Sequence, residues 1–217
     1  STKLMKRKRI NITMEDKLII KYAKCCVNLY AVVSTKDIIT VIKHYEGIKI
    51  DTLKLIALLD NTISKSTQIQ KSDGLYYKFD IMCDSDIKAF YQDVKKMPLF
   101  LPNKKSEFFK YIVSTYCEAI DPPCSTMAVT LAHMYNSPLT KELLTFTYKL
   151  VDGMFNNFRS NVPADYIIDT LLENYPQFKI TTANEKHVLI DLAEDIAYNT
   201  RLYDFRGFTP FELEQVE

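Results

Sequence analysis

The feature that most constrains the fold is the pair Asp73-Gly74, which follows three helical stretches and lies between two short alternating segments. An Asp-Gly pair favours a tight hairpin turn because glycine adopts positive φ at little steric cost. The segments on either side, residues 67–72 and 75–80, alternate as strands with one buried face do. We therefore predict an antiparallel hairpin over residues 67–80.

Before the hairpin, apolar residues repeat with helical spacing in three stretches. The first covers residues 15–29, and residues 30–33 form a short apolar connection. Ser34 is expected to cap a second helix that Gly47 ends, and Asp51 is expected to cap a third. The buried stripe expected on the third helix is Leu53, Ile56, Leu59 and Ile63.

Three short helices followed by a hairpin are the order of a winged helix. We therefore predict a mainly α protein with a flexible basic arm (1–12) and a winged-helix-like domain (13–82). A connecting helix and proline-bounded linker (83–103) are expected to lead to an all-helical domain (104–217). The linker is placed at Met97–Pro102 because prolines bound that extended segment.

Capping residues and prolines predict the helices of the remaining chain. The expected spans are 84–96, 104–117, 122–135, 138–155, 163–175, 182–199 and a short last helix from 209. Asp121-Pro122 and Ser137-Pro138 each place a capping side chain before a proline. Thr182 with Glu185 and Thr209 with Glu212 are capping boxes. The stripe expected to be buried after Thr182 is Val188, Leu189, Leu192 and Ile196.

Charge is distributed unevenly, although the net charge is only +1. Residues 1–80 contain 15 Lys/Arg and 8 Asp/Glu, whereas residues 81–217 contain 13 and 19. A basic N-terminal part points to a polyanionic partner. Five of its positive charges lie in the arm, at Lys3, Lys6, Arg7, Lys8 and Arg9.

Double-stranded DNA is therefore the first partner that the sequence predicts, for a regulatory protein whose helical body senses or dimerises. In a winged helix the third helix enters the major groove and the hairpin contacts phosphates. Asn61 and Gln68 are the candidates for reading base edges. The candidates for phosphate contacts are Lys54, Lys65, Lys71 and Lys78, assisted by Lys6, Arg7, Lys8 and Arg9.

A protein partner is the alternative, because the third helix has no Arg and carries Asp51 and Asp60, which repel a phosphate backbone. In that case the chain is an interaction or inhibitor module of mobile-element or phage origin. Tyr76 and Tyr77 are then expected as exposed aromatic anchors. The residue pattern leaves both partners open.

No pattern in the sequence indicates an enzyme, a metal site or a cofactor. Cys124 and His133 lie on one expected helix, about 13 Å apart at ~1.5 Å per residue, too far to form a catalytic pair. Asp191 and Asp195 share a helix face, which is more typical of a solvated surface than of a metal site. The five cysteines lack disulfide or zinc spacing, and no apolar run is long enough for a membrane span. We therefore expect a non-enzymatic cytoplasmic protein with reduced thiols.

The segment Asn199-Thr-Arg-Leu-Tyr-Asp-Phe-Arg-Gly-Phe-Thr-Pro-Phe-Glu-Leu213 resembles one in uncharacterised proteins of Gram-positive bacteria. There, a pattern N-T-R…G-h-T-P-x-E-L often precedes a zinc-binding SEC-C motif. Pro98–Pro102 with the following Lys105–Tyr111 is similar to a second stretch of those proteins. The Cys-rich SEC-C tail is absent from this chain, and the resemblance implies no activity. Arg201 and Arg206 flank the segment and are expected to pair with Asp204 or to reach an anion, in what we interpret mainly as a structural helix–turn–helix lock.

Overall fold

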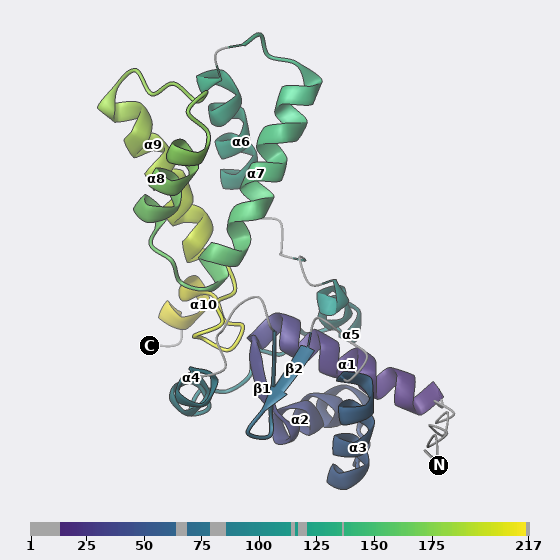
Figure 1. Cartoon of the computed structure of the whole chain (residues 1–217). Coiled ribbons are helices and arrows are strands. Elements are labelled where there is room, and N and C mark those ends of the chain that lie inside the picture. Colours follow the sequence, from purple (N-terminus) through teal and green to yellow (C-terminus); the bar gives the residue numbers. More distant parts are fainter. Residues whose placement is uncertain are drawn as a thin grey trace, which may run out of the picture.

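The computed structural model describes residues 14–63, 69–78, 86–113, 116, 121–135 and 137–215. Helices dominate these residues, and a small three-stranded antiparallel sheet accompanies them, so the expected mainly α class is confirmed. Figure 1 shows an N-terminal unit at the bottom, built by the elements up to residue 112, and a helical bundle at the top.

The N-terminal unit begins with the order helix, strand, helix, helix, strand, strand. Its elements are α1 (Met14–Tyr30), β1 (Val32–Ser34), α2 (Thr35–Glu46), α3 (Thr52–Ile63), β2 (Ile69–Ser72) and β3 (Leu75–Lys78). The predicted hairpin is confirmed: β2 and β3 pair antiparallel around Asp73 and Gly74, which have φ of 50° and 78°.

β1 is the strand that sequence reasoning interpreted as a connection, and that interpretation was wrong. Val33 of β1 lies opposite Tyr76 of β3, so β3 is the central strand and the sheet order is β1-β3-β2. Three residues are too few to show a period, and β1 is a strand only because a distant strand pairs with it.

The predicted limits of α2 are confirmed by both of its caps. The Ser34 side chain accepts a hydrogen bond from the Asp37 backbone N–H, and the Asp37 carboxylate accepts one from the Ser34 N–H. Gly47 ends the helix with φ of 68°. Asp51 likewise accepts a hydrogen bond from Lys54 N at 2.8 Å, as expected of the residue that starts α3.

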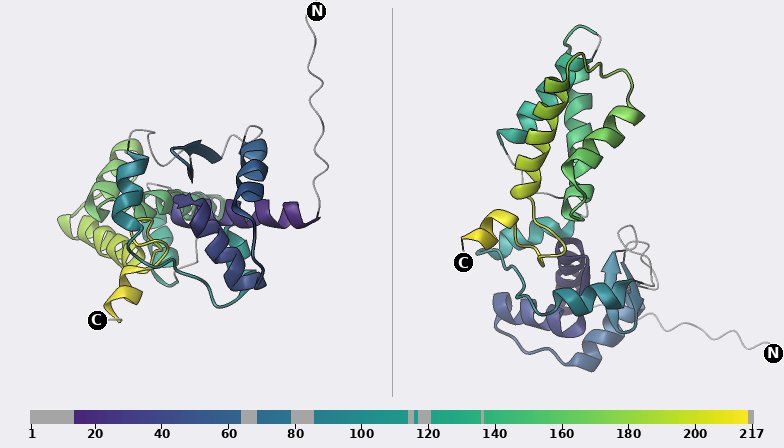
Figure 2. Two further views of the ribbon diagram at one scale, coloured as in Figure 1. Left: turned by 90° about the horizontal axis from the view of Figure 1, so that it is seen from below. Right: turned by 90° about the vertical axis from the view of Figure 1, so that its left-hand side faces the viewer.

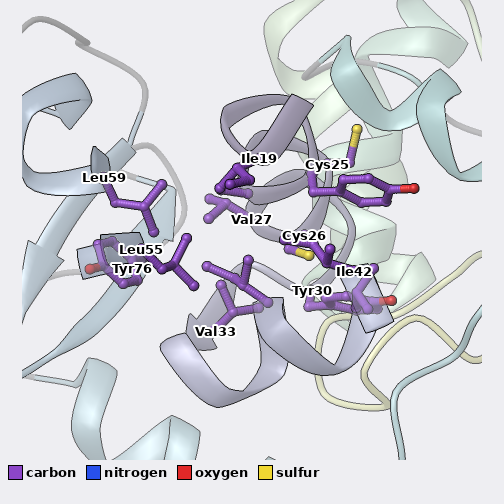
Figure 3. Packing of buried hydrophobic residues seen from close by; sticks show 14 of the residues in the cluster. Ile19, Cys25, Cys26, Val27, Tyr30, Val33, Ile42, Leu55, Leu59 and Tyr76 are labelled. Carbon is purple, nitrogen blue, oxygen red and sulfur yellow. The ribbon is translucent and has the colours of Figure 1, made fainter. Parts of the chain in front are cut away.

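The core of the N-terminal unit lies between α1, α2, α3 and one face of the sheet. Figure 3 shows Leu55, Leu59 and Tyr76 converging with Ile19 and Val33. The stripe predicted for α3 was wrong at Leu53, which is 76% exposed, while Leu55 and Leu58 are buried. Apolar residues occur nearly all round this helix, so their spacing did not identify the buried side.

The opposite face of the sheet is covered too. The helix α4 (Ile87–Val94) packs there, and Ile87 forms a cluster with Val32, Leu75, Tyr77 and the distant Tyr203. Asp84, the expected cap of this helix, lies outside the described residues. A sheet covered on both faces leaves β3 without exposed side chains.

The segment predicted as a linker belongs to the N-terminal core. Leu99, Phe100 and Leu101 pack against it, and Tyr30 Oη donates to the Phe100 carbonyl at 2.7 Å. After it come the short helix α5 (Lys105–Phe108) and a 3₁₀ turn, η1 (Phe109–Ile112), instead of the helix predicted for 104–117. Phe108 and Tyr111 are fully buried there, so the N-terminal unit continues well past the boundary that the prolines suggested.

Four helices form the bundle: α6 (Pro123–Met134), α7 (Lys141–Arg159), α8 (Ala164–Asn174) and α9 (Ala183–Tyr198). The capping box that opens α9 is confirmed, with Thr182 Oγ1 accepting from Glu185 N. α7 starts later than predicted because Thr140, rather than Ser137, caps it. The prediction that Val188 of α9 is buried was wrong, because this side chain is exposed.

The C-terminal segment, residues 199–215, returns from the bundle to the N-terminal unit. Figures 1 and 2 show it between the two bodies, ending in the short helix α10 (Pro210–Glu214). Thr209 and Glu212 form the predicted capping box of α10. Its loop supplies Tyr203 and Arg206, which are both buried.

Candidate recognition surface

One side of α3 is exposed to solvent and is called here the α3 face. Burial of Leu55, Leu58 and Leu59 turns the opposite side of the helix to solvent. The exposed residues of the α3 face are Thr52, Leu53, Lys54, Ala57 and Asp60. Leu53 is the large apolar side chain among them, and Ile48, in the turn before α3, is 40% exposed.

Lys54 on the α3 face and Lys71 beside it each have an acidic neighbour. Lys54 Nζ lies 3.4 Å from Glu15 Oε1 and 4.0 Å from Asp16 Oδ1, both on α1. Lys71, on β2, donates to both carboxylate oxygens of Asp60, at 2.7 and 2.9 Å. That hydrogen bond is the main cause of the raised pKa of Lys71.

These ion pairs make the α3 face nearly neutral. They do not hold the lysine side chains in one position. The Lys54 side chain is 50% exposed and that of Lys71 is 30% exposed. Exposed ion pairs contribute about 0–1 kcal/mol, so either lysine can exchange its carboxylate for another partner at little cost. The α3 face therefore combines the exposed apolar side chain of Leu53 with charges that can exchange their partners.

Three residues that were expected to be accessible are buried. Lys78 is 3% exposed, and Tyr76 and Tyr77 are each 1% exposed. Because β3 is the central strand, Tyr76 points into the three-helix core and Tyr77 into the cluster beneath α4. The predictions of a phosphate contact for Lys78 and of exposed anchors for the two tyrosines were therefore wrong.

The structure covers only some of the other predicted contact residues. Asn61 is half-buried on α3. Lys65, Gln68 and the arm residues Lys6, Arg7, Lys8 and Arg9 lie outside the described residues, so their proposed contacts stay predictions.

Arg206 is buried behind the sheet, where it joins the C-terminal segment to α2. Its Nη2 lies 2.6 Å from Asp37 Oδ1, and its Nη1 donates to the Met97 carbonyl at 3.0 Å. Asp37 Oδ2 also accepts from Tyr91 Oη at 2.8 Å. Burial by itself raises the pKa of Asp37, but the Ser34 N–H and Arg206 outweigh it and lower that pKa.

Arg159 makes the second buried connection, at the end of α7. Its Nη2 donates to the carbonyls of Asn28 and Leu29 at 2.6 and 3.1 Å, and its guanidinium lies 4.4 Å from the centre of the Tyr203 ring. α1 has no basic residue in its own last turn, so Arg159 supplies the positive charge that the C-terminal end of a helix favours.

Arg201 binds within the C-terminal segment. It donates to the Gly207 carbonyl at 3.0 Å and to Glu212 at 2.9 Å, and it lies 3.5 Å above the Phe100 ring. The pairing of Arg201 or Arg206 with Asp204 that we expected is not found among the described residues. Both guanidinium groups bind other protein groups there. Sequence reasoning missed Arg159 and the pairing of Asp37 with Arg206, because these partners are distant in the chain and no spacing signals them.

The remaining chemical groups do not assemble into a reactive site among the described residues. His133 is exposed at the far end of α6 from Cys124, and Asp191 and Asp195 are exposed on α9. Burial raises the pKa of the Cys25 thiol to about 12, which disfavours the nucleophilic thiolate. No group of three or more His, Cys, Asp or Glu side chains in the described part of the chain is placed to hold a metal ion.

Neither a membrane-spanning helix nor a similarity to known proteins helps to identify the function. None of the described helices is both long enough and apolar enough to cross a membrane. The resemblance to proteins that carry a SEC-C motif stays a prediction. Comparisons with protein-family models, with curated proteins and with solved structures found no match to this chain.

Proposed function

We propose that the N-terminal unit is a winged helix and that the chain is a non-enzymatic recognition protein that docks to another protein through the α3 face. The order α1-β1-α2-α3-β2-β3, with sheet order β1-β3-β2 and a tight turn at Gly74, supports the fold proposal. In such a fold the third helix is the element that meets the partner.

The observation that carries the choice of a protein partner is the neutral, partly apolar character of the α3 face. Duplex binding draws most of its affinity from lysines and arginines that neutralise phosphates. Here Lys54 and Lys71 already meet Glu15 and Asp60, while Leu53 is 76% exposed beside them. An apolar side chain surrounded by both signs of charge matches the centre and rim of a protein interface.

Double-stranded DNA is the second candidate, favoured by the position of the same lysines. Lys54 on α3 and Lys71 on the hairpin lie where a winged helix meets the groove and the backbone. Their exposed ion pairs are weak enough for phosphates to displace the carboxylates. On this reading Asn61, Lys65 and Gln68 contribute from the same helix and its end, and the basic arm adds sequence-independent affinity.

One cross-linking experiment distinguishes the two partners. A photoreactive amino acid replaces Leu53 in the full chain. This variant is expressed in cells of the organism from which the protein comes, and irradiation cross-links it to whatever contacts position 53. The protein proposal predicts one adduct that protease degrades and nuclease leaves intact. The control places the same group at Tyr148, exposed on α7, where no such adduct is expected. A nuclease-sensitive adduct at Leu53 overturns the protein proposal in favour of DNA.

A further inference from the structure

A cavity of about 430 Å³, open to solvent, lies between α7 and α8 of the helical bundle, at the other end of the molecule from the α3 face (Figure 1). Sites for small molecules in proteins usually measure about 300–1,000 Å³. Its lining includes Leu150, Met154, Ile167 and Leu171, which give it a mainly apolar wall. The cavity is therefore the right size for a small organic molecule with an apolar body.

Gly153 lines this space without a side chain of its own. The other three glycines of the chain have positive φ, whereas Gly153 lies inside α7 with no backbone requirement for glycine. Glycine costs roughly 0.5–1 kcal/mol in a helix interior relative to alanine. A Cβ at this position would meet no atom within 4 Å, so packing does not exclude a larger residue either. Glycine therefore lowers the stability of α7 here, and neither the backbone nor the packing of this helix requires it.

The polar groups of the lining indicate the charge of the occupant. Lys149 is the one charged residue in the lining, and no ion pair engages it among the described residues. Asn157 and Asn174, both exposed, also line the cavity, and their side chains make no hydrogen bond to the described part of the chain. A cation and two amides beside an apolar wall complement a molecule with one anionic, hydrogen-bonding end.

We propose that this cavity binds a small amphipathic carboxylate, with its apolar body against Met154 and Leu171 and its carboxylate at Lys149. An apolar chain gains affinity from each methylene that leaves water, and the charge-assisted contact with Lys149 fixes its direction. Such a site gives the helical body a sensing role. It does not depend on whether the α3 face meets a protein or DNA.

Decanoate is the probe, titrated calorimetrically into the full chain below its micellar concentration, with decanol as the uncharged control. We expect saturable 1:1 binding of decanoate. Lys149→Gln is expected to weaken decanoate about tenfold, the loss of one charge-assisted hydrogen bond, and to leave decanol unchanged. Equal loss for both probes, or no effect on either, contradicts the assigned role of Lys149.

Gly153→Leu tests the location, because its side chain fills the cavity from α7. We expect decanoate binding to fall below detection, while Gly153→Ala, which adds one methyl group, retains most of it. Circular dichroism establishes that each variant is folded. A methyl NMR shift at Met154 on adding decanoate to the unaltered chain is an independent readout that needs no variant. Unchanged binding by folded Gly153→Leu, or absence of a Met154 shift at saturation, overturns the proposal.

Discussion

Positively charged side chains bind protein groups in two regions of this molecule, and the two regions differ in how deeply these side chains are buried. At the junction between the bundle and the N-terminal unit, Arg159 and Arg206 are 3% and 4% exposed. At the α3 face, Lys54 and Lys71 keep much of their side chains in water. A buried guanidinium that loses its partner leaves an uncompensated charge, whereas an exposed ammonium is rehydrated. The arginines are therefore committed to the fold, and the lysines stay available for recognition.

The largest effect is expected where the buried charge pair is broken. Arg206→Met removes the cation from Asp37 and should lower the free energy of unfolding by about 3–5 kcal/mol, measured by urea denaturation. Met retains apolar bulk, so the loss reports the charge rather than a cavity. Adding Asp37→Asn should recover part of the loss, since the orphaned carboxylate is then gone. If the single variant loses less than about 1 kcal/mol, the distinction between the two regions fails.

Arg159→Met tests the second buried arginine. It leaves the carbonyls of Asn28 and Leu29 without their donor at the end of α1, so we expect a loss of about 2–3 kcal/mol. Hydrogen exchange should locate the change in the last turn of α1. A loss confined to the bundle would contradict the assigned contact between α7 and α1.

Gly207→Ala strains the loop that holds Arg206. Gly207 has φ of +87°, and an added Cβ would lie 3.2 Å from Tyr30 Cε1 and 3.3 Å from Leu29. We expect destabilisation of about 2 kcal/mol, combining left-handed strain with crowding. Gly47→Ala is the matched control, because its φ is +68° with no atom within 4 Å of the added Cβ. An equal loss of unfolding free energy in the two variants would mean that the added Cβ at Gly207 is not crowded by Tyr30 and Leu29 of α1.

The elements that sequence reasoning found are those defined by neighbours in the chain. Ser34 with Asp37 and Thr182 with Glu185 cap helices through residues three apart, and Asp73-Gly74 makes its turn locally. β1 was missed because only pairing with β3 makes it a strand. The buried pair of Arg206 with Asp37 was missed for the same reason, since each side chain looks like a surface residue until the chain folds.

Acid should weaken the junction by protonating Asp37. The pKa of Asp37 is lowered in the folded protein, so its stabilising contribution is complete above its unfolded value of about 3.9. That contribution is lost as the pH falls from there through the folded pKa. Urea denaturation between pH 5 and pH 2 should therefore show a free energy of unfolding that falls with pH, and this fall should be smaller in Asp37→Asn. An unaltered fall in that variant would show that other carboxylates cause the acid sensitivity.

The smallest effect is expected at the α3 face. Lys54→Met removes the exposed pair with Glu15 and should change the free energy of unfolding by less than about 1 kcal/mol. Lys71→Met should behave alike, because Asp60 regains water. A loss comparable to that of Arg206→Met would place these lysines in the fold rather than at a recognition surface.

Recognition through Leu53 is the central claim, and a second substitution tests it directly. The photoreactive residue is placed at Ala57, on the same face, with and without Leu53→Glu. The account predicts a nuclease-resistant protein adduct that Leu53→Glu abolishes while the free energy of unfolding is unchanged. An adduct that survives Leu53→Glu, or one that nuclease destroys, contradicts the account.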